Sequence, residues 1–178
     1  TENRNHNIKL AADILNNSIV TAEGGTWHFN DRSGDTNEAA GFWAAGSIVE
    51  GEYVDSIGGG ICQVATTIFN AVYEAGLPID MRFNHTLYIA SYPNGRDAAV
   101  SYPDLDLWWH NDLSSDVLLQ MSYTDTTITA RLYSVYTGRS VESIEGAWAE
   151  TGEKYKVKFQ EDADLEKDDY YVKTNLRT

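Results

Sequence analysis

The sequence predicts an α+β domain in which a cysteine-bearing helix and an N-terminal helix pack on a mostly antiparallel β-sheet. Three observations lead to this prediction. Apolar residues recur at helical spacing in residues 5–17 and again, more strongly, in residues 61–72. From residue 79 onward, β-branched and aromatic residues dominate and are interrupted by turn residues. The 178 residues are enough for one such domain with a sizeable core and a small appendage.

The N-terminal part begins with a predicted helix over residues 5–17, which ends at Asn16-Asn17. Its apolar positions are Ile8, Ala11, Ala12 and Leu15. Residues 18–21 are expected to form a short strand, and residues 23–25 a turn. The polar segment that follows, up to Gly41, is predicted to be a long loop, and long ordered loops in compact domains are often functional.

The clearest predicted element is a helix that directly follows the glycine run of residues 58–60. One apolar stripe covers a single face of it and consists of Ile61, Val64, Ala65, Ile68, Phe69 and Val72. Gly76 ends the helix, and Pro78 prevents it from continuing. This helix is therefore expected to pack on the sheet along its stripe.

The second half of the chain is predicted to consist mainly of strands. They are expected at residues 79–90, 98–102, 105–110, 117–123 and 126–135. Turn residues separate them at positions 93–95, 111–112 and 125. Together with the two helices, these strands make residues 1–136 one domain.

The pattern weakens after about Thr137. A hairpin between residues 154–159 and 170–173, across the acidic stretch 161–169, would make residues 137–178 a small β appendage. The same residues could instead be the start of a following module.

Charge and composition exclude several classes of function. The formal net charge of −14 repels nucleic acid and anionic lipid, so we exclude DNA and RNA as partners. The single cysteine rules out an intramolecular disulfide, and it lacks the histidine spacing of a zinc site. The glycine run is not followed by the Gly-Lys-Ser/Thr of a phosphate loop. We expect no metal and no cofactor.

No stretch approaches the roughly 20 apolar residues that span a bilayer, so any membrane anchor is expected outside this chain.

Cys62 lies in the first turn of the predicted helix. Backbone N–H groups there have no intrahelical partners and the helix dipole is positive, so both features favour thiolate over thiol. The preceding glycines allow a substrate to approach closely, and the free N–H groups could stabilise an oxyanion. A buried hydrophobic cysteine is the alternative. Because Cys62 lies beside Thr66, at the edge of the apolar stripe, we interpret it as a candidate nucleophile.

Chain geometry selects His85 as the partner of Cys62. The helix from Cys62 to residue 75 rises roughly 20 Å, at about 1.5 Å per residue. An extended strand from residue 79 to His85 also covers roughly 20 Å, at about 3.3 Å per residue. If the strand runs back along the helix, His85 returns to the level of Cys62, as in many thiol enzymes. A solvent-facing strand residue is the alternative. The other histidines fit this geometry less well and are His6, His28 and His110.

A third side chain should orient the imidazole, and two aspartates compete for this role. A tight hairpin through residues 93–95 would bring Asp104 near His85 and would leave Asp97 further away. A wide loop would favour Asp97 instead.

Two arginines in this part of the sequence, Arg82 and Arg96, could bind a substrate carboxylate through their guanidinium groups. Each could equally be an ordinary surface cation, which is the commoner role of arginine.

These motifs resemble the signature of the VanW domain family. The resemblance lies in the glycine–cysteine–glutamine segment at 58–64, its continuation at 66–72, and the segments at 7–12, 25–30, 82–86 and 92–98. It runs from about Arg4 to Val135. The chain departs from the family pattern at residues 27–28 and at Ala65, which do not belong to the cysteine–histidine pair.

The resemblance implies an envelope protein of mostly Gram-positive bacteria, on the extracellular face of the cell. The family takes its name from a component of glycopeptide-resistance clusters. Some members are L,D-transpeptidases, which join peptidoglycan stem peptides through a cysteine acyl-enzyme. The resemblance implies Cys62 as nucleophile and His85 as its base. Gly60, Gln63 and Asp97 also match the family pattern, which restores Asp97 as a candidate to orient the imidazole.

We therefore expect an enzyme in which Cys62 attacks the carbonyl that precedes the terminal D-Ala of a stem peptide. Backbone N–H groups near Cys62, with the Gln63 side chain, would hold the oxyanion. A cysteine peptidase or amidase would use the same cysteine–histidine pair. An alternative of a different class is a non-catalytic wall-binding or accessory module in which Cys62 is buried.

Overall fold

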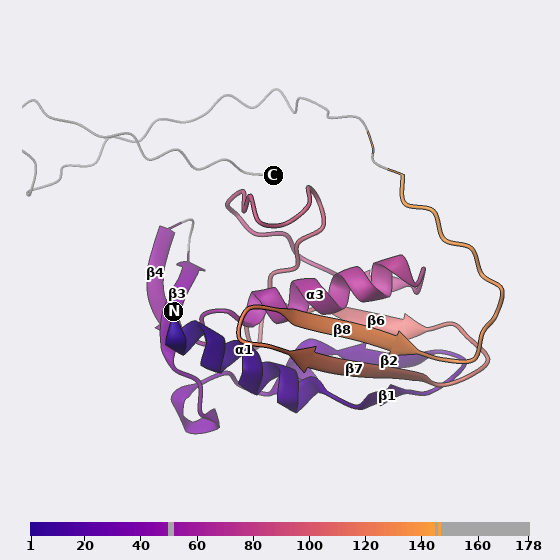
Figure 1. Cartoon of the computed structure of the whole chain (residues 1–178), viewed down its shortest axis with the longest axis horizontal. Helices are drawn as coiled ribbons and strands as arrows, with labels where there is room; N and C mark the ends of the chain where they lie inside the picture. The colour runs from indigo at the N-terminus through magenta and orange to yellow at the C-terminus, as the bar shows by residue number, and fades with distance from the viewer. Residues whose placement is uncertain (50–51, 145, 147–178) are drawn as a thin grey trace, which may run out of the picture.

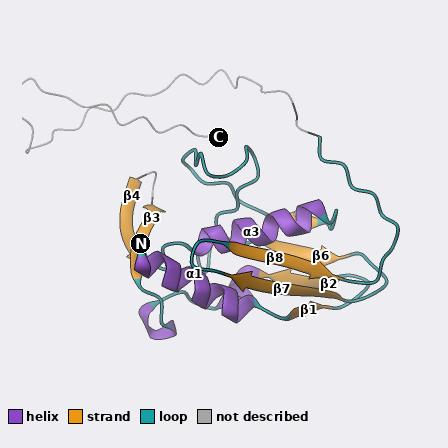
Figure 2. Cartoon of the chain, viewed as in Figure 1, coloured by secondary structure: helices purple, strands orange, loops and turns teal. Residues whose placement is uncertain are grey.

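The computed structural model describes residues 1–49, 52–144 and 146. Its helices are α1 (Glu2–Leu15), α2 (Phe29–Ser33), the short 3-10 helix η1 (Glu38–Ala40) and α3 (Ile61–Glu74). Its strands are β1 (Ser18–Val20), β2 (Gly25–His28), β3 (Ala44–Val49), β4 (Glu52–Ile57), β5 (Ile79–Met81), β6 (Trp108–Asn111), β7 (Val117–Tyr123) and β8 (Ile128–Tyr133). The predicted α+β class is confirmed, with helices packed against antiparallel strands (Figure 2).

The strands form three small antiparallel sheets rather than one large one. Two of them have three strands, in the orders β1-β7-β8 and β2-β6-β5, and the third is the β3–β4 hairpin. Figure 1 shows α3 lying along the strands, with the β3–β4 hairpin beside the N-terminal end of α1. The start of α3 therefore lies where the first helix and the hairpin meet.

The core lies between the helices and the sheets. All six residues of the predicted stripe on α3 are buried, as are the four apolar positions predicted for α1. Trp27 on β2 and Trp109 on β6 are fully buried as well, with ring centroids 6.0 Å apart. Each large apolar side chain buried in this way contributes about 1.5–3 kcal/mol to folding.

Asn7 on α1 fixes the chain that leads into α3. Its side chain is fully buried, and its Nδ2 donates to the carbonyl oxygens of Trp43 (2.8 Å) and Gly59 (3.0 Å). Its Oδ1 accepts a hydrogen bond from the Trp43 N–H (2.9 Å). One side chain thus ties α1 both to the start of the β3–β4 hairpin and to the glycine turn before Cys62.

Several predicted elements differ in the N-terminal part. The first helix begins at Glu2 rather than residue 5, because the Thr1 hydroxyl caps it by accepting from the Arg4 N–H. The polar segment up to Gly41, predicted to be a loop, contains β2, α2 and η1. The buried Trp27 and Phe29 anchor this segment in the core, and its polar residues obscure that anchoring in the sequence.

The predicted strand over residues 79–90 is wrong beyond Met81. Only a single bridge, from Phe83 to Ala99, continues the pairing, and the predicted strand 98–102 is likewise reduced to bridges. The predicted strand 105–110 begins only at Trp108. The physical reason lies in the functional site, because the His85 N–H donates to the Asp97 carboxylate instead of to a neighbouring strand.

The described residues after β8, 137–144 and 146, form neither helix nor strand. Arg139 attaches this segment to the region just after α3, with one hydrogen bond to the Gly76 carbonyl oxygen (2.7 Å) and an ion pair to Asp112 (2.9 Å). The predicted hairpin between residues 154–159 and 170–173 lies outside the described residues. None of the helices in the described part of the chain is both long and apolar enough to cross a bilayer.

Candidate active site

The glycine run turns the chain sharply from β4 into α3. Gly60, the N-cap residue, has a φ of 112°, a backbone conformation that residues other than glycine rarely adopt. Gly59 is required for a different reason, since a Cβ atom there would lie 2.2 Å from the carbonyl oxygen of Ala45. The glycine turn therefore packs directly on the backbone of β3 and positions Cys62 in the first turn of the helix.

The backbone amides of this first turn are not all occupied. The N–H groups of Ile61 and Gln63 donate to the carbonyl oxygens of Gly58 (3.1 Å) and Gly60 (3.0 Å). The Cys62 N–H has no acceptor within the described part of the chain. Cys62 is half-buried, and this unused donor on the residue itself is suited to hold an oxyanion formed by attack of its sulfur.

A ladder of polar contacts holds an extended segment against α3. Its three rungs are Cys62 Sγ with Val100 O (3.5 Å), Thr66 Oγ1 with Ala98 N (2.9 Å), and Asn70 Nδ2 with Arg96 O (2.8 Å). Steps of four residues advance about 6 Å along a helix, and steps of two residues advance about 6.6 Å along an extended chain. The two spacings match, so residues 96–100 run antiparallel to α3, and each rung fixes the position of this segment along the helix.

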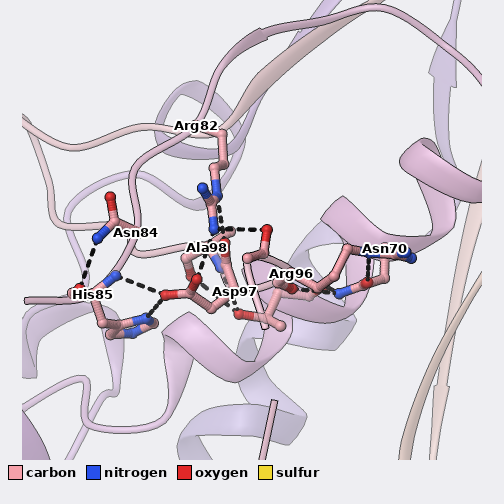
Figure 3. Close-up of polar contacts among 9 residues, drawn as sticks. Asn70, Arg82, Asn84, His85, Arg96, Asp97 and Ala98 are labelled. Atoms are coloured by element: carbon pink, nitrogen blue, oxygen red, sulfur yellow. Dashed lines mark hydrogen bonds and ion pairs between the residues drawn. The ribbon is translucent and has the colours of Figure 1, made fainter. Parts of the chain in front are cut away.

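The ladder also sets the direction of Asp97. The backbone groups of alternate residues in an extended chain point to opposite sides. Residues 96, 98 and 100 therefore bond to α3 through their backbone, and the carbonyl oxygen of Asp97 accepts from Arg82 Nε instead (2.5 Å). The Oδ2 atom of Asp97 accepts hydrogen bonds from both Nδ1 and the backbone N–H of His85, each at 2.7 Å (Figure 3). His85 is buried, and the Asp97 contact at Nδ1 leaves Nε2 as the ring nitrogen open to Cys62, which is close enough to raise the pKa of His85. The structure thus brings Cys62, His85 and Asp97 together.

The imidazole of His85 carries a proton at neutral pH. Burial lowers the pKa of His85, but hydrogen bonds to Asp97 and Cys62 and the charges of both groups outweigh burial and raise the pKa from 6.5 to about 9. Burial alone would raise the pKa of Asp97, but the hydrogen bonds from His85 and the charge of Arg82 lower it below its usual 3.8. The site therefore combines an imidazolium with an ionised aspartate.

Arg82 and Arg96 have structural partners rather than open guanidinium groups. Arg82 Nη2 donates to Asp97 Oδ1 (2.6 Å), so both carboxylate oxygens of Asp97 are held (Figure 3). Arg96 forms an ion pair with Glu74 and donates from Nε to Asn70 Oδ1 (2.8 Å). The sequence suggested both as binders of a substrate carboxylate. In the structure, Arg82 positions Asp97, and Arg96 anchors the extended segment to α3.

The competing residues lie elsewhere. Asp104 is exposed in the turn between Ser101 and Leu105. The backbone N–H and the Nδ1 atom of His85 are both bound to Asp97 instead. The tight hairpin that favoured Asp104 does not form, because residues 84–97 make a wide loop. His110 pairs with Asp80 (2.8 Å) on the sheet β2-β6-β5.

Two further side chains, which the sequence analysis did not identify, border the site. The ring of Tyr92 lies 6.0 Å from the imidazole of His85. Arg4 packs its side-chain stem against Gly60, immediately before α3. Tyr92 could have been found from its place five residues before Asp97 in the same motif. Arg4 gives no signal in the sequence, because only the packing of α1 against the glycine turn brings it here.

Comparison with known proteins gives one family and two relatives. The sequence profile described as "VanW like protein" matches residues 3–133, which include the whole cysteine–histidine–aspartate arrangement. The uncharacterized protein YoaR of Bacillus subtilis (strain 168) is 38% identical over 133 residues, which cover 75% of this chain and 44% of YoaR. The vancomycin B-type resistance protein VanW of Enterococcus faecalis (strain ATCC 700802 / V583) is 25% identical over 138 residues, which cover 75% of this chain and 50% of VanW. The chain thus spans about half the length of the curated relatives it matches. No solved structure matches.

Proposed function

This chain belongs to the VanW-like protein family, and on that premise we propose that it is a cysteine acyltransferase that cross-links peptidoglycan stem peptides, an L,D-transpeptidase. The observation that carries the proposal is the chain of contacts from Asp97 through His85 to Cys62 at the start of α3. These three residues supply a nucleophile, a base and an orienting carboxylate, which is the arrangement that acyl transfer requires.

The proposed attack starts from a Cys62 thiolate with the proton on His85, a form that a helix N-terminus and an adjacent imidazolium favour. In this form the hydrogen bond from the thiol to the Val100 carbonyl oxygen is given up. The raised pKa of His85 keeps the ring protonated at neutral pH, so the proton is held on His85 Nε2 beside the Cys62 sulfur. Asp97 supports this form because its carboxylate accepts from Nδ1 and stabilises the positive ring. No separate deprotonation then has to precede the attack.

In the first step, the Cys62 sulfur forms a bond to the carbonyl carbon that precedes the terminal D-Ala. The carbonyl oxygen becomes an oxyanion that the unused Cys62 N–H can hold. When this intermediate collapses, the carbon–nitrogen bond breaks and D-Ala leaves as an amine with the proton of His85. The product is a thioester on Cys62.

In the second step, the side-chain amine of another stem peptide attacks the thioester. His85, now neutral, accepts a proton from this amine, a new amide bond forms, and the sulfur leaves as thiolate. Water in place of the amine gives hydrolysis, which would make the protein a peptidase. The chemistry up to the thioester is common to both outcomes.

This function implies a location on the extracellular face of the cell envelope, where stem peptides occur. The relative in Enterococcus faecalis is named a vancomycin B-type resistance protein. A change in stem-peptide ends or cross-links is a chemically reasonable route to such resistance, and we extend this association to the present chain as part of the proposal.

Intact-protein mass spectrometry tests the proposed function directly. After incubation with a tetrapeptide stem, the wild type should gain the mass of the peptide minus D-Ala, and a dimeric or trimmed peptide should appear in solution. Cys62→Ala should give neither, and His85→Ala should slow acylation by roughly 10²–10⁴-fold, because the general acid is lost.

His110→Ala is the matched control, since His110 is also paired with an aspartate but lies on the β2-β6-β5 sheet. It should acylate like the wild type. If the wild type forms neither adduct nor product, and its thiol is labelled by iodoacetamide no faster than in His85→Ala, the enzyme proposal is wrong. A non-catalytic wall-binding module would then be the better description.

A further inference from the structure

A small pocket opens one residue away from the candidate nucleophile. It is lined by Gln63 on α3, by Arg4, Ile8 and Lys9 on α1, and by the β7–β8 turn around Asp125. Cys62 does not line the pocket itself, but Gln63 directly follows it in the first turn of α3, so the pocket borders the helix turn that carries the sulfur. The proposed function makes no use of these α1 residues.

Arg4 is the pocket cation for which the described side chains supply no counter-ion. Its Nη1 donates to the carbonyl oxygen of Gly46 (3.1 Å), and no carboxylate in the described part of the chain lies within ion-pair distance of it. Lys9 differs, because it forms an ion pair with Asp125 (2.9 Å). Arg82 and Arg96 are paired as well. In a chain with a net charge of −14, a half-buried guanidinium beside the site can still bind an anion.

Packing holds Arg4 against the entrance of the site. A Cβ atom at Gly60 would lie 3.0 Å from Arg4 Cγ and 3.2 Å from its carbonyl oxygen. The first turn of α1 is therefore in contact with the residue that caps α3. A side chain fixed by its stem in this way loses little conformational freedom when a ligand binds.

Arg4 and Cys62 have opposite effects on the pKa of Tyr92. Burial and the negative charge of Cys62 raise the pKa of Tyr92, whereas the positive charge of Arg4 opposes this rise. Both charges thus lie near one phenol, whose ring is 6.0 Å from that of His85. Arg4 and Cys62 are thus both near enough to Tyr92 to influence its pKa.

We propose that Arg4, with the side chain of Gln63, binds the free carboxylate of the terminal residue in the donor peptide. This inference rests on the proposed function and assigns residues that recognise the free C-terminus of the donor peptide, which ends one residue after the carbonyl attacked by Cys62. In such a peptide the carboxylate lies only three bonds from that carbonyl carbon, and it needs a cation close to the nucleophile. A guanidinium and an amide can donate to its two oxygens together.

Binding to an inactive variant tests this subsite without requiring catalysis. Calorimetric titration of Cys62→Ala with a tetrapeptide stem and with its C-terminal amide should show roughly tenfold or tighter binding of the free acid, as a charge-assisted hydrogen-bonded pair would give. In Cys62→Ala/Arg4→Gln this preference should disappear, and Arg4→Lys should retain part of it. Arg131→Gln in the same background removes an equal charge from an exposed position on β8 and should change nothing.

Equal binding of acid and amide, no binding of either, or a preference that survives Arg4→Gln in a variant that melts like its parent would overturn the subsite. The proposed function is judged separately, by the acyl-enzyme of the wild type. Acylation without a preference for the acid refutes only the role of Arg4. A preference for the acid without acylation refutes only the enzyme.

Discussion

At the scale of single residues, Asp97 determines the state of the site. It binds His85 at two nitrogen atoms and is itself held by Arg82. This arrangement fixes the ring orientation, leaves Nε2 for Cys62 and helps to raise the pKa of His85. The imidazolium is lost as the pH rises through about 9, so proposed acylation should decline there.

Asp97→Asn tests this dependence. The change removes a negative charge and a charge-assisted hydrogen bond, so the pKa of His85 should fall and the alkaline limb of the pH–rate profile should move to lower pH. Acylation at neutral pH should slow by roughly 10²–10⁴-fold, because the ring is no longer oriented and charged. The measurement is the acylation rate from pH 5 to 10.

Asp80→Asn is the matched control, since Asp80 pairs with His110 away from the site. It should leave both the rate and the alkaline limb unchanged. An alkaline limb that stays in place in Asp97→Asn would refute the assignment of His85 as the titrating group.

At the scale of elements, the site depends on how α3 is joined to its neighbours. The glycine turn packs on the backbone of β3, Asn7 on α1 bonds to the Gly59 carbonyl oxygen, and the polar ladder ties residues 96–100 to the helix. Cys62 lies on the ladder, and Asp97 lies between two of its rungs. The relative placement of the reacting groups is thus set by backbone contacts that tolerate little change.

Gly59→Ala should damage both stability and function. The new Cβ would approach the Ala45 carbonyl oxygen to 2.2 Å, so the turn or the hairpin must move. We expect a loss of about 1–3 kcal/mol in the free energy of unfolding, as overpacking typically gives. A thermal melt and the rate of thiol labelling measure the two effects.

Gly46→Ala provides the control within the same hairpin, because the atom nearest to its Cβ would be a side-chain oxygen at 3.9 Å. It should remain close to the wild type in both measurements. If Gly59→Ala melts at the same temperature as Gly46→Ala, the close packing of the glycine turn on β3 is not important for the fold.

At the scale of the whole molecule, stability is coupled to the charge of the site. The pKa of His85 is raised from 6.5 to about 9 on folding. Its contribution to stability is therefore fully present below about pH 6.5 and is lost as the pH rises through about 9. The pKa of Asp97 is lowered, so its contribution is present above about pH 3.8 and is lost as the pH falls through its lower folded value.

Denaturant unfolding between pH 6 and pH 10 tests this coupling. The wild type should lose on the order of 3 kcal/mol across this range, the equivalent of the pKa shift of His85. His85→Gln should show a much flatter profile over the same range. A wild-type profile as flat as that of His85→Gln would show that the cysteine–histidine–aspartate contacts do not contribute to folding.

The sequence by itself determined the local features of this protein. Helical periodicity gave the stripe of α3 and the apolar face of α1, because a 3.6-residue repeat is a property of neighbouring positions. It also marked Cys62 at a helix start behind three glycines. The family resemblance pointed to Asp97, although the expected strand register favoured Asp104.

Only the tertiary structure decided which distant side chains meet. The His85 N–H bonds to a carboxylate rather than to a strand, so the predicted strand 79–90 stops at Met81 and a wide loop brings Asp97 to the imidazole. Arg82, suggested by the sequence as a binder of substrate carboxylate, is instead bound to Asp97, and α1 brings Arg4 against Gly60 without any signal in the sequence. Such choices depend on competition among long-range partners for the same hydrogen bonds and charges, which no local pattern encodes.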